Sequence, residues 1–289
     1  MCALATDRQT TNVRAFEPAD LRRLLRFIDT AWRVHLRISP VELNTRAKTF
    51  PCLLAEDSVG LRGFMMIEPV QPDVGLFVAA GLRDTWGVKP YLDSLLPPME
   101  RVAINKSLKE LLYIGNTPWL TDELQARGFE VREWVMAFER IGTNYPPEPI
   151  YTTALIRTAH LRDLPILLKL DKLAFHRIWH KSPGNFSEAL AKAVSFAVAA
   201  VDDRIVAYEW CELYGQHAHL TRLAVHPKYQ GQGIGAQLLR QAIVDAIKAG
   251  ANLITLNTQE SNYRSRGLYE RFGFVDTGQR IPVLWKLLA

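Results

Sequence analysis

The sequence contains an internal repeat, and this repeat constrains the fold more than any other feature. In each half a short strand is followed within a few residues by an Asp that can cap the next helix, since Val13–Phe16 precedes Asp20 and Ile156–Ala159 precedes Asp163. The halves also close on matching segments, which are Leu124–Phe129 and Tyr269–Phe274. The offset is 143 residues at the start and 145 at the end, which indicates a duplicated unit.

A turn-rich stretch with three prolines, residues 143–150, separates the two halves. Such a stretch cannot hold a helix or a central strand, so it is interpreted as a linker. A chain of 289 residues suits two domains of ordinary size. We therefore expect one domain over residues 1–142 and a second over residues 151–289.

The hydrophobic pattern of the second half predicts an α+β domain with a mixed sheet. Asp202-Asp203 is expected to form the tight turn of a hairpin. The expected strands are 154–158, 195–201, 204–213, 217–225, 252–257, 274–277 and 283–288, and the expected helices are 233–248 and 262–271.

A glycine-rich loop connects the strand ending at Val225 to the helix that begins near Gly233. Glycines at alternate positions let the backbone approach a ligand closely, and the helix start adds free N–H groups, so the loop suits a phosphate or pyrophosphate. It is neither a P-loop nor a Rossmann fingerprint, because the run is GxGxG and no Lys-Ser or Lys-Thr follows. Taken alone, the loop is equally compatible with an ordinary tight strand-to-helix connection.

Two motifs together resemble those of the GNAT superfamily of N-acetyltransferases. The family's acetyl-CoA motif is matched by Gln230, Gly233 and Gly235. Its downstream motif is matched by Asn262, Tyr269, Gly273 and Phe274. The resemblance covers about residues 150–289 and extends to the first half only through the repeat. It implies two tandem GNAT-like domains, each a mixed and mostly antiparallel sheet flanked by helices.

The resemblance also implies a function, which is transfer of an acetyl group from acetyl-CoA to an amine on a small molecule or a peptide N-terminus. In such an enzyme Asn262 contacts the CoA arm, and Tyr269 protonates the departing thiolate. The backbone groups expected to hold the pantetheine arm and the pyrophosphate are those of Leu223, Ala224, Val225, Gln230, Gly231, Gln232, Gly233, Ile234 and Gly235. The alternative is a CoA-binding sensor or scaffold without turnover.

The reaction also needs a base for the attacking amine. His219 is the candidate, because strand alternation predicts that it shares a face with positions 221, 223 and 225, and an imidazole titrates near neutrality. Glu209 and Glu212 are rivals. Alternation puts these two carboxylates on opposite faces, so at most one of them is expected to be well placed.

The first half lacks both motifs at the equivalent places. Residues 82–90 contain a single glycine, Gly87, and Leu124 stands where the second half has Tyr269. We therefore expect a degenerate GNAT-like domain without CoA binding, and one active site per chain.

Composition limits the partners. A formal net charge of +5 with scattered Lys and Arg predicts no specific nucleic-acid partner. The longest apolar stretch is far short of the ~20 residues that span a bilayer. Three widely spaced cysteines without a CxxC pair predict neither a disulfide framework nor a zinc finger and fit a reducing cytoplasm. His217 and His219 have the spacing of a metal pair on a strand, but no third or fourth ligand is evident nearby, so no metal site is expected.

Overall fold

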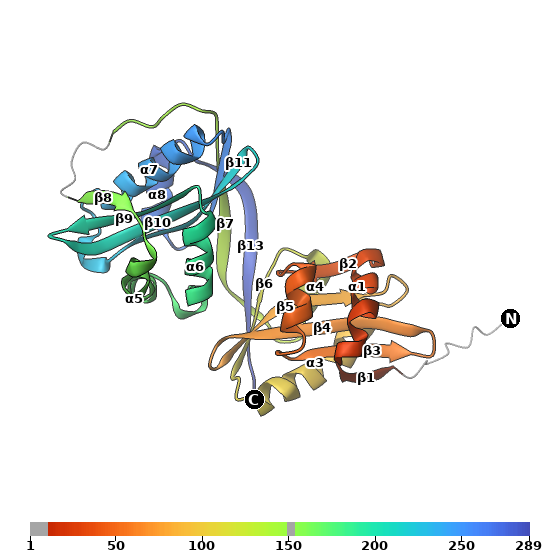
Figure 1. Ribbon diagram of the computed structural model, residues 1–289. Coiled ribbons are helices and arrows are strands. Elements are labelled where there is room, and N and C mark those ends of the chain that lie inside the picture. The colour runs from red at the N-terminus through yellow and green to blue at the C-terminus, as the bar shows by residue number, and fades with distance from the viewer. Residues whose placement is uncertain (1–10, 149–153) are drawn as a thin grey trace. The chain divides into compact units, whose positions relative to one another are not determined.

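The computed structural model describes residues 11–148 and 154–289, which form two compact units (Figure 1). The first unit comprises the described residues up to Glu133 together with Ile281–Ala289, and the second comprises Trp134–Arg280. Within the expected linker 143–150, residues 143–148 contain no helix or strand, while residues 149 and 150 lie outside the described residues.

The sheet of the first unit has the strand order β1-β3-β4-β5-β6-β13, and β2 pairs with β5. Its neighbouring strands are antiparallel except for β5 and β6, which run parallel. The strands are β1 (Asn12–Ala15), β2 (Arg33–Leu36), β3 (Cys52–Asp57), β4 (Gly60–Gln71), β5 (Val74–Leu82), β6 (Glu110–Ile114) and the end of β13 (Val275–Leu287).

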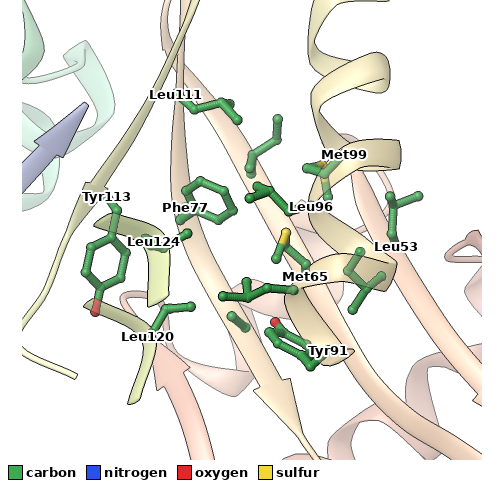
Figure 2. Close-up of a cluster of buried hydrophobic side chains, with 14 of the residues drawn as sticks. Leu53, Met65, Phe77, Tyr91, Leu96, Met99, Leu111, Tyr113, Leu120 and Leu124 are labelled. Carbon is green, nitrogen blue, oxygen red and sulfur yellow. The ribbon is translucent and has the colours of Figure 1, made fainter. Parts of the chain in front are cut away.

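Helices cover this sheet and bury its apolar side chains. Figure 2 shows Tyr91 and Met99 of α3 packed in one buried cluster with Met65 of β4 and Phe77 of β5, all of them inaccessible to solvent. Leu124, at the end of α4, belongs to the same cluster. The helices are α1 (Leu21–Thr30), α2 (Pro40–Arg46), α3 (Val88–Asn105) and α4 (Pro118–Gln125).

The second unit repeats this plan with the strand order β7-β12-β11-β10-β9-β8. Its strands are β7 (Glu130–Ile141), β8 (Leu155–Thr158), β9 (Ser195–Val201), β10 (Arg204–Tyr214), β11 (His217–Val225) and β12 (Leu253–Gln259). Its helices are α5 (Leu164–Ala174), α6 (Pro183–Lys192), α7 (Ile234–Lys248) and α8 (Tyr263–Arg271). The predicted α+β class and the tandem arrangement are confirmed.

The repeat extends to individual pairs of residues. The parallel ladder begins with Val74 opposite Glu110 in the first unit and with His217 opposite Leu253 in the second, which is the same register 143 positions on. An Arg–Asp ion pair also recurs at this offset. Arg14 contacts Asp20 at 2.7 Å, and Arg157 contacts Asp163 at 2.7 Å, so each Asp fixes the entry to the next helix.

The two units exchange their last strands. The greater part of β7, Val135 to Ile141, pairs with β12 of the second unit, although it follows the first half of the chain. Reciprocally, residues 283–287 of β13 pair with β6 of the first unit. The unit boundaries thus lie inside β7 and β13 and differ from the expected 142 and 151, because linear sequence does not reveal which strand a terminal strand joins.

Local predictions hold well in the second half. Strands β9 and β11 have the expected bounds, and Asp202 and Asp203 adopt left-handed backbone angles with φ of 46° and 59°, as a tight hairpin turn requires. One prediction is wrong: the chain ends in a single strand, β13, rather than in two strands over 274–277 and 283–288.

Candidate acyl-transfer site

Strands β11 and β12 part in the middle of the second unit. Their parallel pairing runs from His217 opposite Leu253 to Leu220 opposite Leu256, and both strands continue beyond it. The backbone of Thr221–Val225 that faces β12 therefore has no strand partner among the described residues. This segment includes Leu223, Ala224 and Val225, the predicted partners of the pantetheine arm.

The glycine loop lies directly after this unpaired segment. Gly231 and Gly233 have φ of +81° and +80°, in the left-handed region that glycine tolerates, and Gly233 is the N-cap of α7. None of the six consecutive N–H groups from Gly231 to Ala236 has a hydrogen-bond partner among the described residues. These amides and the helix dipole make the N-terminus of α7 electropositive, so this region is suited to bind an anion.

Side chains brace the loop from outside. The Gln230 side-chain amide donates to the Val225 carbonyl at 3.1 Å, and Arg264 of α8 donates to Gln230 Oε1 at 2.8 Å. The Gln232 amide donates to the Lys228 carbonyl at 3.3 Å. The glutamine of the motif thus ties the strand end to α8, and neither glutamine side chain bonds to the amides of the loop.

Tyr269 of α8 is buried, with 7% of its surface exposed, and packs near Phe138 and Phe274. It shares a hydrophobic cluster with Leu220 and Leu256, the last pair before the strands part. Burial raises the pKa of its phenol to about 12, opposed in part by a hydrogen bond from Ser265. The hydroxyl is therefore protonated at neutral pH.

Asn262 caps α8. Its Oδ1 accepts from the Ser265 N–H at 3.4 Å, and its Nδ2 donates to Thr258 Oγ1 at 3.2 Å. The side chain thus positions the helix that carries Tyr269. A contact between Asn262 and the CoA arm remains a prediction.

A β-bulge changes the face on which His219 lies. Trp210 pairs with Arg222 and Cys211 pairs with Leu220, so Thr221 is left between two pairs. Ala218 and Leu220 consequently pack in the cluster with α7, whereas Leu223 packs against α7 from the other side of the bulge. The expectation that positions 219, 221, 223 and 225 share one face is wrong, because simple alternation holds only in an unbulged strand.

Glu209 lies on the α7 face and is completely buried. Its Oε1 accepts from the Ser195 hydroxyl at 2.7 Å and from the Ala197 N–H at 3.1 Å, and Ser195 also bonds Asp245 of α7 at 2.9 Å. Burial raises the pKa of Glu209 to about 8. As a candidate base Glu209 is misplaced, because an enclosed and largely protonated carboxyl on the opposite face cannot accept a proton from an entering amine.

His219 lies on the other face, opposite Glu212 in the β10–β11 register. Its Nδ1 is 2.8 Å from Thr255 Oγ1, and the same hydroxyl is 2.7 Å from His217 Nε2. Burial lowers the pKa of His219, and the negative charge of Glu212 opposes this effect in part. The imidazole is therefore mainly neutral at pH 7 and able to accept a proton.

A buried ion pair anchors the segment between α5 and α6, and no local sequence pattern predicts it, because its two residues lie far apart in the chain. Asp171 and Arg222 are 1% and 8% exposed and lie 3.0 Å apart. The guanidinium also donates to the Trp179 carbonyl and stacks 3.8 Å over the Phe175 ring, while Asp171 accepts from the Lys181 N–H. This network fixes residues 175–181 above the face that carries His219.

The first unit fills the equivalent opening with its own chain. Strands β5 and β6 part after Leu76 opposite Leu112, and β2 then pairs along β5, with Leu36 opposite Ala79 and Arg33 opposite Leu82. His35 of β2 is 6% exposed, and burial lowers its pKa to about 4, so the inserted strand is part of the core.

In residues 11–148 and 154–289, no group of three or more His, Cys, Asp or Glu side chains is arranged to hold a metal ion. No helix in this part of the chain is long and apolar enough to cross a membrane.

Comparisons with known proteins agree with this architecture. Residues 164–274 match the model of the Acetyltransferase (GNAT) family. A candidate ribosomal protein bS18 alanine N-acetyltransferase of Bacillus subtilis is 25% identical over 145 residues, which cover 46% of this chain and 95% of the relative. Mycothiol acetyltransferase of Acidimicrobium ferrooxidans is 23% identical over 58% of this chain and 59% of its own.

Solved structures match over nearly the whole chain. A GCN5-related N-acetyltransferase from Sphaerobacter thermophilus has a TM-score of 0.67 at 14% identity and covers 96% of both chains. A tandem GNAT protein from the clavulanic acid biosynthesis pathway has a TM-score of 0.66 at 12% identity and covers 96% of this chain and 98% of its own. With the parted strands and the amide loop in its second unit, the chain resembles GNAT N-acetyltransferases in sequence over residues 164–274 and shares their fold over nearly its whole length.

Proposed function

We propose that the protein transfers an acetyl group from acetyl-CoA to an amine by direct attack, with Tyr269 as the general acid. The observation that carries the proposal is the parting of β11 and β12 after the Leu220–Leu256 pair, which leads directly to six unpaired amides. An extended arm with amide groups would satisfy the backbone of Thr221–Val225, as an added strand does. A pyrophosphate would accept from the amides of Gly231–Gly235.

The surroundings of Tyr269 and His219 suit these side chains to the two proton transfers of the reaction. The amine nitrogen attacks the thioester carbon, the C–S bond breaks, and the Tyr269 hydroxyl gives its proton to the leaving sulfur. Burial raises the pKa of the phenol, and it also disfavours a thiolate anion in the same place, so the two effects of burial on this proton transfer oppose each other. His219 takes the proton of the attacking ammonium, and Glu212 stabilises the resulting imidazolium.

The acceptor is proposed as a primary amine that enters on the face of His219. One relative is named for the alanine of a ribosomal protein, and another for mycothiol. A peptide with an N-terminal alanine and a small primary amine are therefore the first acceptors to test.

The test is thiol release from acetyl-CoA with this amine panel. Tyr269→Phe should lower the rate by about 10²–10⁴, the usual contribution of a general acid, and leave CoA affinity unchanged. Tyr263→Phe is the matched control, because Tyr263 lies on the same helix and is 73% exposed. CoA binding without release above hydrolysis for any amine would favour the sensor alternative, and equal rates for Tyr269→Phe and wild type would exclude Tyr269 as the acid.

A further inference from the structure

The first unit contains a pocket of about 350 Å³ in which α1, the β3–β4 turn and the end of β5 meet. Three arginines line it, Arg23 and Arg26 from α1 and Arg83 from the residue after β5. At the 143-residue offset of the repeat, Arg83 corresponds to His226, the first residue after β11, from which the chain leads into the glycine loop of the second unit. Both units thus place anion-attracting groups after the same strand.

The charges in the pocket are unbalanced. Arg23 is bound to Asp20 at 3.0 Å and to Glu56, so its charge is compensated. Arg26 and Arg83 have no carboxylate partner among the described residues. The acidic lining residue Asp84 already accepts from the Trp32 N–H at 3.1 Å.

Apart from Thr30, the other lining residues carry no polar side chain. Phe27 and Leu61 are buried with 9% and 3% of their surfaces exposed, and Val59 is 69% exposed. A ligand that fits this pocket has an anionic group that binds the guanidiniums of Arg26 and Arg83, and an apolar part that packs against the apolar lining residues. Guanidinium forks match phosphate oxygens in pairs, and charge-assisted bonds of this kind are about twice as strong as neutral ones.

We propose that this pocket binds a small organic phosphate through Arg26 and Arg83. The site is separate from the acyl-transfer site and does not depend on the proposed function. The first unit, whose cofactor opening is filled by β2, therefore keeps an anion site made of side chains in place of backbone amides.

Calorimetric titration of the full chain tests the proposal. The protein is first saturated with CoA to occupy the amide loop, and inorganic phosphate or phenyl phosphate is then added in a buffer of low salt. We expect one saturable site, at least fivefold tighter for phenyl phosphate, and at least a tenfold loss of affinity in Arg26→Ala/Arg83→Ala. Arg101→Ala/Lys106→Ala removes the same charge from exposed positions of the same unit and should bind like wild type.

Several results would overturn the proposal. These are a titration that does not saturate, or equal affinity in the Arg26→Ala/Arg83→Ala variant. Equal affinity for the two phosphates would contradict binding of an organic group by the apolar residues of the pocket. Far-UV circular dichroism and urea midpoints of both variants establish that they are folded.

Discussion

Leu220 of β11 and Leu256 of β12 form the last pair of their parallel ladder, and beyond this pair the two strands part. The parallel ladder of the first unit ends one pair earlier, at Leu76 opposite Leu112, and β2 then pairs along β5. The same fold thus gives an opening in one unit and a filled sheet in the other. The difference between the two units is the four-residue strand β2, which pairs with β5 in the first unit.

The filled sheet predicts one CoA per chain. Strand β2 already uses the backbone groups of Ala79–Leu82 that correspond to Arg222–Val225 of the second unit. Isothermal titration calorimetry with CoA should give a stoichiometry of one. Two sites of similar affinity would mean that the ligand displaces β2 from the edge of β5.

Substitution of Gly231 by Ala should weaken CoA binding at least tenfold. A Cβ at this position meets no protein atom within 4 Å, so it would occupy space left for the ligand. Gly250→Ala is a close control, because Gly250 also has positive φ and open space around it. Both changes should cost about 1–2 kcal/mol of folding stability, since both force a left-handed conformation on a residue with a Cβ. Equal CoA affinity in the two variants would argue against the amide loop as the binding site.

Glu209 should make stability depend on pH. Its pKa rises from 4.5 to about 8 on folding, so the unfolded chain releases this proton first as pH rises. The stabilisation is complete below pH 4.5 and is lost progressively up to pH 8, by an amount on the order of 5 kcal/mol. Glu209→Gln should flatten this part of the profile in urea unfolding between pH 5 and 8. A wild-type profile with the same slope as that of the variant would contradict the buried, protonated carboxyl.

Division of the chain at residue 150 should prevent folding of the C-terminal half. The fragment 151–289 lacks β7, which pairs with β12 and contributes Met136 and Phe138, each 1% exposed. The fragment 134–280 contains the whole second unit and should unfold cooperatively on heating. A cooperative transition in 151–289 would show that β7 is dispensable.

The pH profile of acetyl transfer should show an acidic limb with a midpoint below 6.5. Burial lowers the pKa of His219, and a base must be neutral to act. His219→Ala should remove the limb. Glu212→Gln should move the midpoint lower still, because the charge of Glu212 raises the pKa of His219. A limb that is unchanged in both variants would assign the base to another group.

Features encoded in contiguous residues could be predicted from the sequence, and features that depend on pairing could not. The left-handed turn at Asp202-Asp203 and helix α7 follow from local composition and apolar spacing. The bulge at Thr221 depends on the register with β10, so the predicted position of His219 on the same face as Leu223 and Val225 is wrong. The insertion of β2 could not be predicted either, because a four-residue strand carries little periodicity.

The strand exchange has a consequence for inheritance. A deletion that removes the first half of the gene also removes β7 from the unit that contains Tyr269, and loss of the last codons takes a strand from the first unit. Selection on the second unit is then enough to preserve β7, although this strand follows the first half of the chain.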